Sequence, residues 1–376
     1  MNFDSICVHG AKDPNNKTGA LAVPIYQSAT FAHPGVGQST GYDYARVQNP
    51  TREPLERLVA ALEGGREALA FASGMASLDA FMYLLKKNDH IIASDDLYGG
   101  TVRLFDSLAL RAGLETTYVD YSDLTALEKT LRPTTQMVFV ETPTNPMMKV
   151  ADIAAIRAVL PKKVLLVVDN TFLTPYFQKP LALGADLVLH SGTKYLAGHN
   201  DTLAGFLVVN DPELAEKLRF ITKTVGTGLA PFDSFLLIRS LKTLALRLEK
   251  SQANAIKVAN WLSQNPKVSK VYYPAFADPK SLEIQKKQTT GFGAMISFLV
   301  TTEETAIKAL EKVKLILYAE SLGGVETLIT YPYLQTHADL PVERRLALGI
   351  NERLLRLSLG VEDPNDLIQD LEQALA

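Results

Sequence analysis

The chain has 376 residues, of which 47% are hydrophobic and 21% charged, values typical of a globular protein with one large and one smaller domain. The net charge of −3 and the lack of a basic stripe argue against nucleic acid as a partner. Every apolar run is far shorter than the ~18 residues of a membrane span, and the single Cys7 excludes an internal disulfide framework and a cysteine-based zinc site.

Residues 1–54 are interrupted by turn residues and are predicted to form an arm that does not fold alone and lies on a neighbouring subunit. The first residues lack the basic and apolar pattern of a signal peptide, which together with the single cysteine favours a cytoplasmic protein. Within the arm, Arg46 follows two tyrosines, and its planar guanidinium suits a phosphate group. By themselves, however, these residues favour an ordinary arginine in a solvated loop.

An anion site is predicted where the first strand meets a helix. A helix runs from Pro54 to the pair Gly64-Gly65, and a strand over 68–71 follows it. Small residues at 73–77 then open a helix that extends to about Leu85. Backbone N–H groups at such a helix start point outward, and Gly74 lets a phosphate approach closely. Many α/β turns share this pattern, so the signal is weak when it stands alone.

Two further strands are followed by loops with polar side chains. A strand over 90–94 precedes Tyr98, whose ring can stack on a flat cofactor and whose hydroxyl can transfer a proton. A helix then continues through Arg111. A strand over 136–140 precedes a loop with two prolines, in which Asn145 can hydrogen-bond a cofactor or a carboxylate. A packing tyrosine and a turn asparagine are the common alternatives.

An acid and a lysine stand at the ends of two buried strands. The apolar strand over 164–168 ends in Asp169, and an acid in that position points into the crevice where open α/β sheets bind ligands. The strand over 186–189 precedes Lys194, whose pKa desolvation lowers so that the amine can form a Schiff base. Pyridoxal phosphate needs such a lysine for its aldehyde and an acid for its ring nitrogen. A surface lysine and a capping acid are the alternatives.

The strand–helix alternation up to the strand over 204–209 predicts a doubly wound, mostly parallel sheet. A long helical run over 232–263 is expected to link it to a smaller α+β unit. That unit is predicted from strands at 270–273, 293–300 and 315–319, a helix at 303–312 and a closing helix from Asp366. The predicted domains are therefore an arm over 1–54, a large domain over 55–240 and a small domain over 241–376.

Arg356 lies in the small domain, in a strand with apolar neighbours, and such an arginine needs an anion. A substrate carboxylate and a structural acid are both possible partners. No pattern of metal ligands was found, so no metal is expected.

Seven motifs, taken together, resemble the Cys/Met metabolism family of pyridoxal 5'-phosphate (PLP) enzymes, which includes cystathionine γ-synthases and cystathionine lyases. The resemblance implies a fold-type I PLP enzyme, and its motifs run from about residue 9 to 360. The motifs are Tyr42–Thr51, Ser73–Met75, Asp96–Thr101, Glu141–Pro146, Val168–Phe172, His190–Tyr195 and Glu320–Gly324.

The resemblance also implies roles for individual residues. Lys194 would carry the cofactor as a Schiff base, Asp169 would face its ring nitrogen and Tyr98 would stack on the ring. The phosphate would be held by Gly74, Met75, Ser191 and Thr193, and by Tyr44 and Arg46 of a neighbouring subunit. The substrate α-carboxylate would be bound by Asn145, Ser321 and Arg356. The expected assembly is a tetramer built from catalytic dimers, with small amino acids as substrates and no nucleic-acid or membrane partner.

The expected reaction is γ-replacement, in which an O-acyl-homoserine and cysteine give cystathionine. Glu320 before Ser-Leu-Gly resembles the γ-acting members, although some bacterial β-lyases keep this glutamate, and a structural acid is the plain alternative. Gly100 stands where methionine γ-lyases typically carry cysteine. The stretches 198–201 and 330–341 look most like cystathionine γ-synthase/O-acetylhomoserine thiolyase sequences of Gram-positive bacteria.

Other reactions stay open at this point. A cystathionine γ- or β-lyase is the alternative within the family. Val47 stands where some synthases carry a second arginine, which leaves the contact to a distal carboxylate open. A fold-type I aminotransferase and a non-enzymatic binding protein fit the motifs less well.

Overall fold

Two β-sheets organise the chain in the computed structural model, which describes residues 1–12 and 18–376. The larger sheet contains β1 (Glu67–Phe71), β2 (His90–Ser94), β3 (Glu115–Val119), β4 (Thr135–Glu141), β5 (Leu165–Asp169), β6 (Leu187–Ser191) and β7 (Gly205–Val209). The smaller sheet contains β8 (Val268–Tyr272), β9 (Met295–Val300), β10 (Leu317–Tyr318), β11 (Leu328–Thr330) and β12 (Leu354–Ser358).

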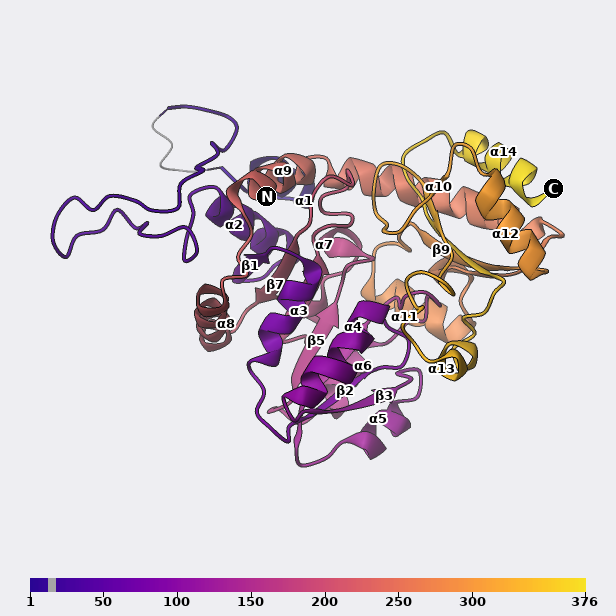
Figure 1. Cartoon of the computed structure of the whole chain (residues 1–376), viewed down its shortest axis with the longest axis horizontal. Helices are drawn as coiled ribbons and strands as arrows, with labels where there is room; N and C mark the ends of the chain where they lie inside the picture. The colour runs from indigo at the N-terminus through magenta and orange to yellow at the C-terminus, as the bar shows by residue number, and fades with distance from the viewer. Residues whose placement is uncertain (13–17) are drawn as a thin grey trace.

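Helices surround both sheets (Figure 1). The α-helices are α1 (Phe3–His9), α2 (Arg52–Glu63), α3 (Gly74–Met82), α4 (Gly99–Arg103), α5 (Leu124–Thr130), α6 (Ile153–Val159), α7 (Thr174–Phe177), α8 (Pro212–Val225), α9 (Pro231–Leu241), α10 (Leu244–Gln264), α11 (Pro279–Gln288), α12 (Glu303–Lys312), α13 (Val342–Ala347) and α14 (Pro364–Leu375). A π-helical segment, η1 (Leu104–Ala109), and two 3-10 segments, η2 (Pro180–Leu183) and η3 (Pro274–Phe276), complete the set.

The larger sheet has the order β1-β7-β6-β5-β4-β2-β3, and only β7 runs antiparallel to its neighbours. This architecture confirms the predicted doubly wound, mostly parallel sheet. Strand β4 shows why such strands are apolar throughout. Met137 and Phe139 enter one core, whereas Val138 and Val140 enter the other. Successive side chains of a strand point to opposite faces, and here both faces are covered.

Each face of this sheet is covered by its own helices. Leu78 of α3 and Leu218 of α8 pack on the face that contains Phe139. Leu58 of α2 and Ile156 of α6 pack on the opposite face. The left-handed Gly64 ends α2 and accounts for the predicted stop of this helix.

The carboxyl ends of the parallel strands meet at one edge of the sheet. Glu141 ends β4, Asp169 ends β5 and Ser191 ends β6, and the strands are paired so that Glu141 lies opposite Asp169. The strand order reverses between β2 and β4, and open α/β sheets bind ligands at such a point.

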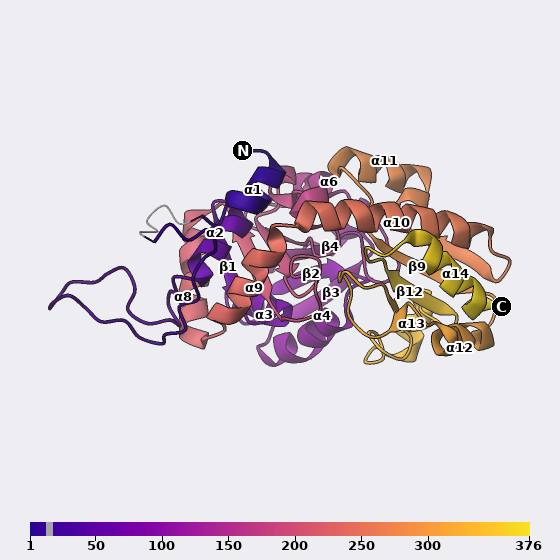
Figure 2. The same cartoon turned by 90° about the horizontal axis from the view of Figure 1, so that it is seen from above.

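The smaller sheet lies at the far end of the molecule, and α10 runs along the long axis towards it (Figures 1 and 2). The predicted helical run over 232–263 is divided into α9 and α10 at Lys242-Thr243. Helices α12 and α14 pack together beside this sheet, with Leu371 and Ala309 buried. The exact domain boundaries drawn from the sequence stay a prediction.

The amino-terminal arm has two different parts. Helix α1 packs on α2, and its Cys7 is buried. Residues 18–48 form a mostly exposed loop that extends away from the body, whereas Asn49 is buried (Figure 1). Residues 13–17 of the predicted arm lie outside the described part of the chain. Contact of the arm with another subunit stays a prediction, as does the cytoplasmic location. None of the helices described here combines the length and the apolarity needed to cross a bilayer.

Candidate active site

A pocket of about 220 Å³ lies at the carboxyl edge of the larger sheet and is closed from the other side by the small domain. Eleven of the thirteen predicted site residues line it. They are Gly74, Met75, Tyr98, Asn145, Asp169, Ser191, Thr193, Lys194, Glu320, Ser321 and Arg356. Residues from 74 to 356 therefore converge on one cavity.

Lys194 lies just beyond β6, and its side chain points to the small domain. Its Nζ donates a hydrogen bond of 2.8 Å to Ser321 Oγ. Burial, together with the nearby positive charge of Arg356, lowers the pKa of Lys194 from the ordinary 10.5 to about 8. About a tenth of the amine is therefore neutral at pH 7, far more than for an ordinary lysine, and the neutral form is the nucleophile.

Two carboxyl groups stand side by side at the ends of β4 and β5. Asp169 Oδ1 accepts a hydrogen bond of 2.9 Å from the Thr171 backbone N–H, and burial raises the pKa of Asp169. Glu141 Oε2 accepts from the Tyr98 backbone N–H at 3.2 Å, and its Oε1 has no partner among the described residues. Burial and the neighbouring charge of Asp169 raise the pKa of Glu141 well above its usual range. A protonated ring nitrogen in this pocket would supply the missing cation.

The start of α3 forms a narrow cradle against the end of β6. Ser73 caps the helix by accepting the Ala76 backbone N–H at 3.0 Å. A side chain at Gly74 would place its Cβ about 3.0 Å from Cβ and Oγ of Ser191, so only glycine leaves this approach open. Gly74 and Met75, the first two residues of this nine-residue helix, line the pocket, and the N–H groups of a helix start stabilise an anion.

Tyr98 stands at the start of α4 and lines the pocket. A Cβ at Gly100 would lie only 2.4 Å from Cε1 of the tyrosine ring. The glycine therefore leaves room for the ring, which is 42% exposed in the single chain.

Arg356 is buried, with 1% of its surface exposed, and has no carboxylate partner among the described residues. Its guanidinium donates to Asn145 Oδ1 at 2.7 Å and to the Ser321 carbonyl at 3.1 Å, while Nε remains without a partner. Burial lowers the pKa of Arg356 from 12.5 to about 10, so the group stays charged at neutral pH. The anion that this cation needs can be a substrate carboxylate. The sequence left two partners open for Arg356, a substrate carboxylate and a structural acid. Among the described residues no acid forms an ion pair with it, which leaves the substrate carboxylate.

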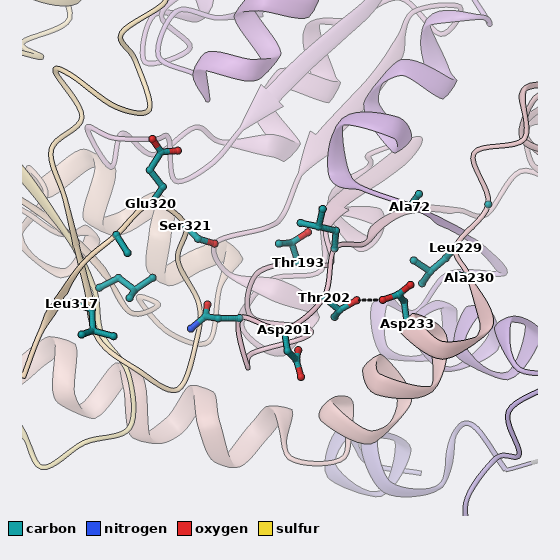
Figure 3. Close-up of a pocket in the computed structure, with 15 residues that line it drawn as sticks. Ala72, Thr193, Asp201, Thr202, Leu229, Ala230, Asp233, Leu317, Glu320 and Ser321 are labelled. Atoms are coloured by element: carbon teal, nitrogen blue, oxygen red, sulfur yellow. Dashed lines mark hydrogen bonds between the residues drawn. The ribbon is translucent and has the colours of Figure 1, made fainter.

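Glu320 lies at the mouth of the pocket. It also lines a second, wider hollow of about 790 Å³, and Figure 3 shows it beside Ser321 and across from Thr193. The hollow carries Asp201 and Asp233, and Asp233 accepts a hydrogen bond of 2.7 Å from the Thr202 hydroxyl.

Tyr44 and Arg46 do not line the pocket of their own chain. They lie in the exposed arm, where Arg46 donates to the Lys223 carbonyl and lies over the Tyr44 ring at 5.4 Å. Their assignment to the phosphate of a neighbouring subunit therefore stays a prediction.

Other residues at the pocket were not singled out from the sequence. Glu141 was part of a quoted motif, but only Asn145 of that motif was assigned. Thr171 and Thr336 also line the pocket, and His337 lies directly behind it. Glu141 and Thr171 could have been recognised as polar side chains at the ends of apolar strands. Thr336 and His337 do not follow such a strand.

These residues fit PLP. The pocket provides a desolvated amine, a buried acid without a cation, a glycine cradle at a helix start and an exposed aromatic ring, which are the groups that this cofactor requires. The site and the doubly wound sheet together define a fold-type I PLP-dependent enzyme.

The sequence profile of the Cys/Met metabolism PLP-dependent enzyme family matches residues 4–376, and the chain belongs to this family. It is 48% identical to a cystathionine gamma-lyase of Bacillus subtilis (strain 168), over all of this chain and 99% of the relative. It is 47% identical to a cystathionine beta-lyase of Lactococcus lactis subsp. cremoris, over 98% of this chain and 97% of the relative. It is also 48% identical to a cystathionine gamma-synthase/O-acetylhomoserine (thiol)-lyase of B. subtilis, over 95% of this chain and 92% of the relative.

Solved structures agree with this assignment. Cystathionine gamma-lyase from Lactobacillus plantarum, complexed with L-serine, superposes with a TM-score of 0.96 at 44% identity. Cystathionine gamma synthase from Xanthomonas oryzae pv. oryzae, in complex with aminoacrylate and cysteine, superposes with a TM-score of 0.97 at 38% identity. Each comparison covers 100% of this chain and 98% of the other. The protein is therefore a PLP-dependent enzyme of cysteine and methionine metabolism.

Proposed function

We propose that the enzyme catalyses γ-replacement, in which cysteine displaces the acyloxy group of an O-acyl-homoserine to give cystathionine. The Cγ–O bond breaks and the acyloxy group leaves as a carboxylate. The Cγ–S bond forms, and the thiol gives up its proton. The observation that carries the proposal is the position of Glu320, a carboxylate at the junction of the inner pocket and the wider outer hollow.

The inner pocket is suited to hold the homoserine part. Arg356 offers its unpartnered Nε to the α-carboxylate, while Asn145 fixes the guanidinium through its side-chain oxygen. Two parallel hydrogen bonds from a guanidinium orient a carboxylate as well as bind it. When bound, PLP acts as an electron sink that makes the Cα proton of the amino acid acidic. Lys194, with its lowered pKa, is the base that can take this proton and return it to a neighbouring carbon.

The outer hollow is suited to admit the second amino acid. Thr193, Glu320 and Ser321 line both cavities, so a thiol that enters through the hollow reaches the carbon from which the acyloxy group departs. Glu320 can accept a hydrogen bond from the ammonium group of the incoming cysteine. Three acids and no lysine or arginine line this hollow, which favours a cationic group at this place.

A cystathionine lyase is the second candidate, and the relatives support it to the same degree as the synthase. Relatives named gamma-lyase and beta-lyase are 48% and 47% identical, which is as similar as the gamma-synthase/thiol-lyase. A lyase uses the same carboxylate clamp and the same lysine, and differs in the bond that is broken.

Product analysis with the cofactor-loaded enzyme tests the proposal. One reaction contains O-acetylhomoserine with cysteine, and the other contains cystathionine alone. Cystathionine that accumulates in the first, with little turnover in the second, supports γ-replacement. Rapid breakdown in the second contradicts it. Release of 2-oxobutyrate with cysteine then indicates γ-cleavage, whereas pyruvate with homocysteine indicates β-cleavage.

A further inference from the structure

His337 lies behind the pocket, in the segment between β11 and α13, and its side chain is completely buried. Its Nε2 lies 3.2 Å from the carbonyl oxygen of Leu97 and 3.1 Å from that of Asn145. Leu97 and Asn145 belong to two different loops at the carboxyl edge of the larger sheet. A single imidazole of the small domain therefore contacts both loops.

The contacts determine which ring nitrogen carries the proton. Carbonyl oxygens only accept, so Nε2 must be the donor. Nδ1 lies 2.8 Å from the Thr336 hydroxyl, which can donate to it. Burial and the charge of Arg356 lower the pKa of His337 to about 4, so the ring is neutral with its proton on Nε2 at neutral pH.

Both loops carry a group proposed to act in the pocket. The peptide unit between Leu97 and Tyr98 is held at its two ends, because its C=O accepts from His337 and its N–H donates to Glu141. Asn145 is likewise held twice, because its backbone carbonyl accepts from His337 and its side-chain oxygen accepts from Arg356. Loss of the imidazole donor would remove one of the two bonds that hold each group.

We propose that His337 is a positioning residue that sets the orientation of the Tyr98 ring and the Asn145 amide through one shared Nε2–H donor. The proposal rests on the roles given above to Tyr98 and Asn145, and it is independent of which bond the enzyme cleaves. His337 does not itself line the pocket.

The test compares two polar amides at this position. His337→Gln can place an N–H donor where Nε2 lies, whereas the shorter His337→Asn reaches only to the Nδ1 position. The first readout is the dissociation constant of L-alanine, which has an α-carboxylate and no leaving group, followed by the absorbance of the bound cofactor. The second is the circular dichroism of the cofactor band, which depends on the ring that stacks on it. Neither readout requires turnover, so failure of the γ-replacement proposal would not affect them.

The matched control is His90, which is also completely buried and lies between the hydroxyls of Thr117 and Thr135, each at 2.9 Å. It stands at the amino end of β2, on the opposite edge of the sheet from the pocket. His90→Gln and His90→Asn therefore report on the loss of a buried histidine without an effect on the site.

We expect His337→Asn to weaken alanine binding about tenfold and to change the cofactor band, as loss of a buried hydrogen-bond donor implies. His337→Gln should stay within about threefold of the wild type, and both His90 variants should bind alanine as the wild type does. Equal losses in the two His337 variants, or an equal loss in the His90 variants, would overturn the proposal. If His337→Asn does not fold, the ¹⁵N chemical shifts of His337 in the wild-type holoenzyme show which ring nitrogen carries the proton. A proton on Nε2 supports the proposal, and a proton on Nδ1 overturns it.

Discussion

Ser321 accepts the hydrogen bond of Lys194 Nζ with its hydroxyl at 2.8 Å, and its own carbonyl accepts from Arg356. Its φ of +96° is rare for a residue other than glycine. Such a backbone costs about 1–3 kcal/mol and persists only where the surroundings require it. Here the backbone turns so that one serine contacts both the lysine and the arginine, which explains why strain is retained at this position.

Replacements of Ser321 separate the strain from the hydroxyl. Ser321→Gly and Ser321→Ala both remove the hydrogen bond to Lys194, so we expect similar losses of activity, about tenfold. Only glycine relieves the positive φ, so Ser321→Gly should be more stable than Ser321→Ala by about 1 kcal/mol. Urea unfolding of the two variants measures the difference. An alanine variant as stable as the glycine variant would show that the backbone is not strained.

Replacement of Arg356 tests the carboxylate clamp. Arg356→Lys keeps the positive charge but loses the planar pair of donors, so KM for the amino-acid substrate should rise about tenfold or more, with a smaller change in kcat. Steady-state kinetics at saturating cofactor measures both constants. An unchanged KM in Arg356→Lys would place the α-carboxylate elsewhere.

The lowered pKa of Lys194 predicts how the cofactor-free protein recovers PLP. Only the neutral amine attacks an aldehyde, so the rate of recombination should rise tenfold per pH unit below the pKa and level off above about 8, instead of near the ordinary 10.5. Stopped-flow absorbance over this pH range measures the rate. Because the charge of Arg356 contributes to the shift, Arg356→Leu should move the inflection to higher pH. A rate that still rises steeply at pH 10 would contradict the lowered pKa.

Buried His90 predicts a loss of stability in acid. Burial, with the charge of Arg132, lowers the pKa of His90 from 6.5 to about 4 in the folded protein, so between these values the unfolded chain binds one more proton. Stability that is present above pH 6.5 is therefore lost as the pH falls towards 4, by up to about 1.4 kcal/mol per pH unit.

His90→Gln removes this contribution and provides the test. Between pH 7 and pH 5 the wild type should lose about 2 kcal/mol more than His90→Gln, measured by urea unfolding at each pH. Parallel curves for the two proteins would mean that folding does not lower the pKa of His90.

The sequence predicted those parts of the molecule that depend on neighbours along the chain. The runs that end in Asp169 and Ser191 are continuous and apolar because both faces of their strands are buried, and such runs are recognisable without a structure. Strand β3 was missed because Glu115–Val119 is mostly half-exposed at the sheet edge and shows no apolar run. The expected long helical run over 232–263 has a break at Lys242-Thr243 that its leucine pattern does not reveal.

Contacts between distant segments had no local signal. The hydrogen bond from Lys194 to Ser321 spans 127 residues, and the contact from His337 to Leu97 spans 240. Buried polar groups such as these are positioned by the packing of the small domain against the larger sheet. The motif residues Tyr44 and Arg46 were named from the family resemblance. In the single chain they do not reach the pocket, so their role depends on a contact that the chain alone does not make.

The most direct test of the account is to find the residue that holds the cofactor. Reduction of the holoenzyme with borohydride fixes PLP to the amine to which it is bound, and peptide mass spectrometry then locates the modified residue. We predict the modification on Lys194, with loss of the visible cofactor band, and no modification in Lys194→Ala. Modification of a different lysine, or a wild-type protein that takes up no cofactor, would contradict the proposed site.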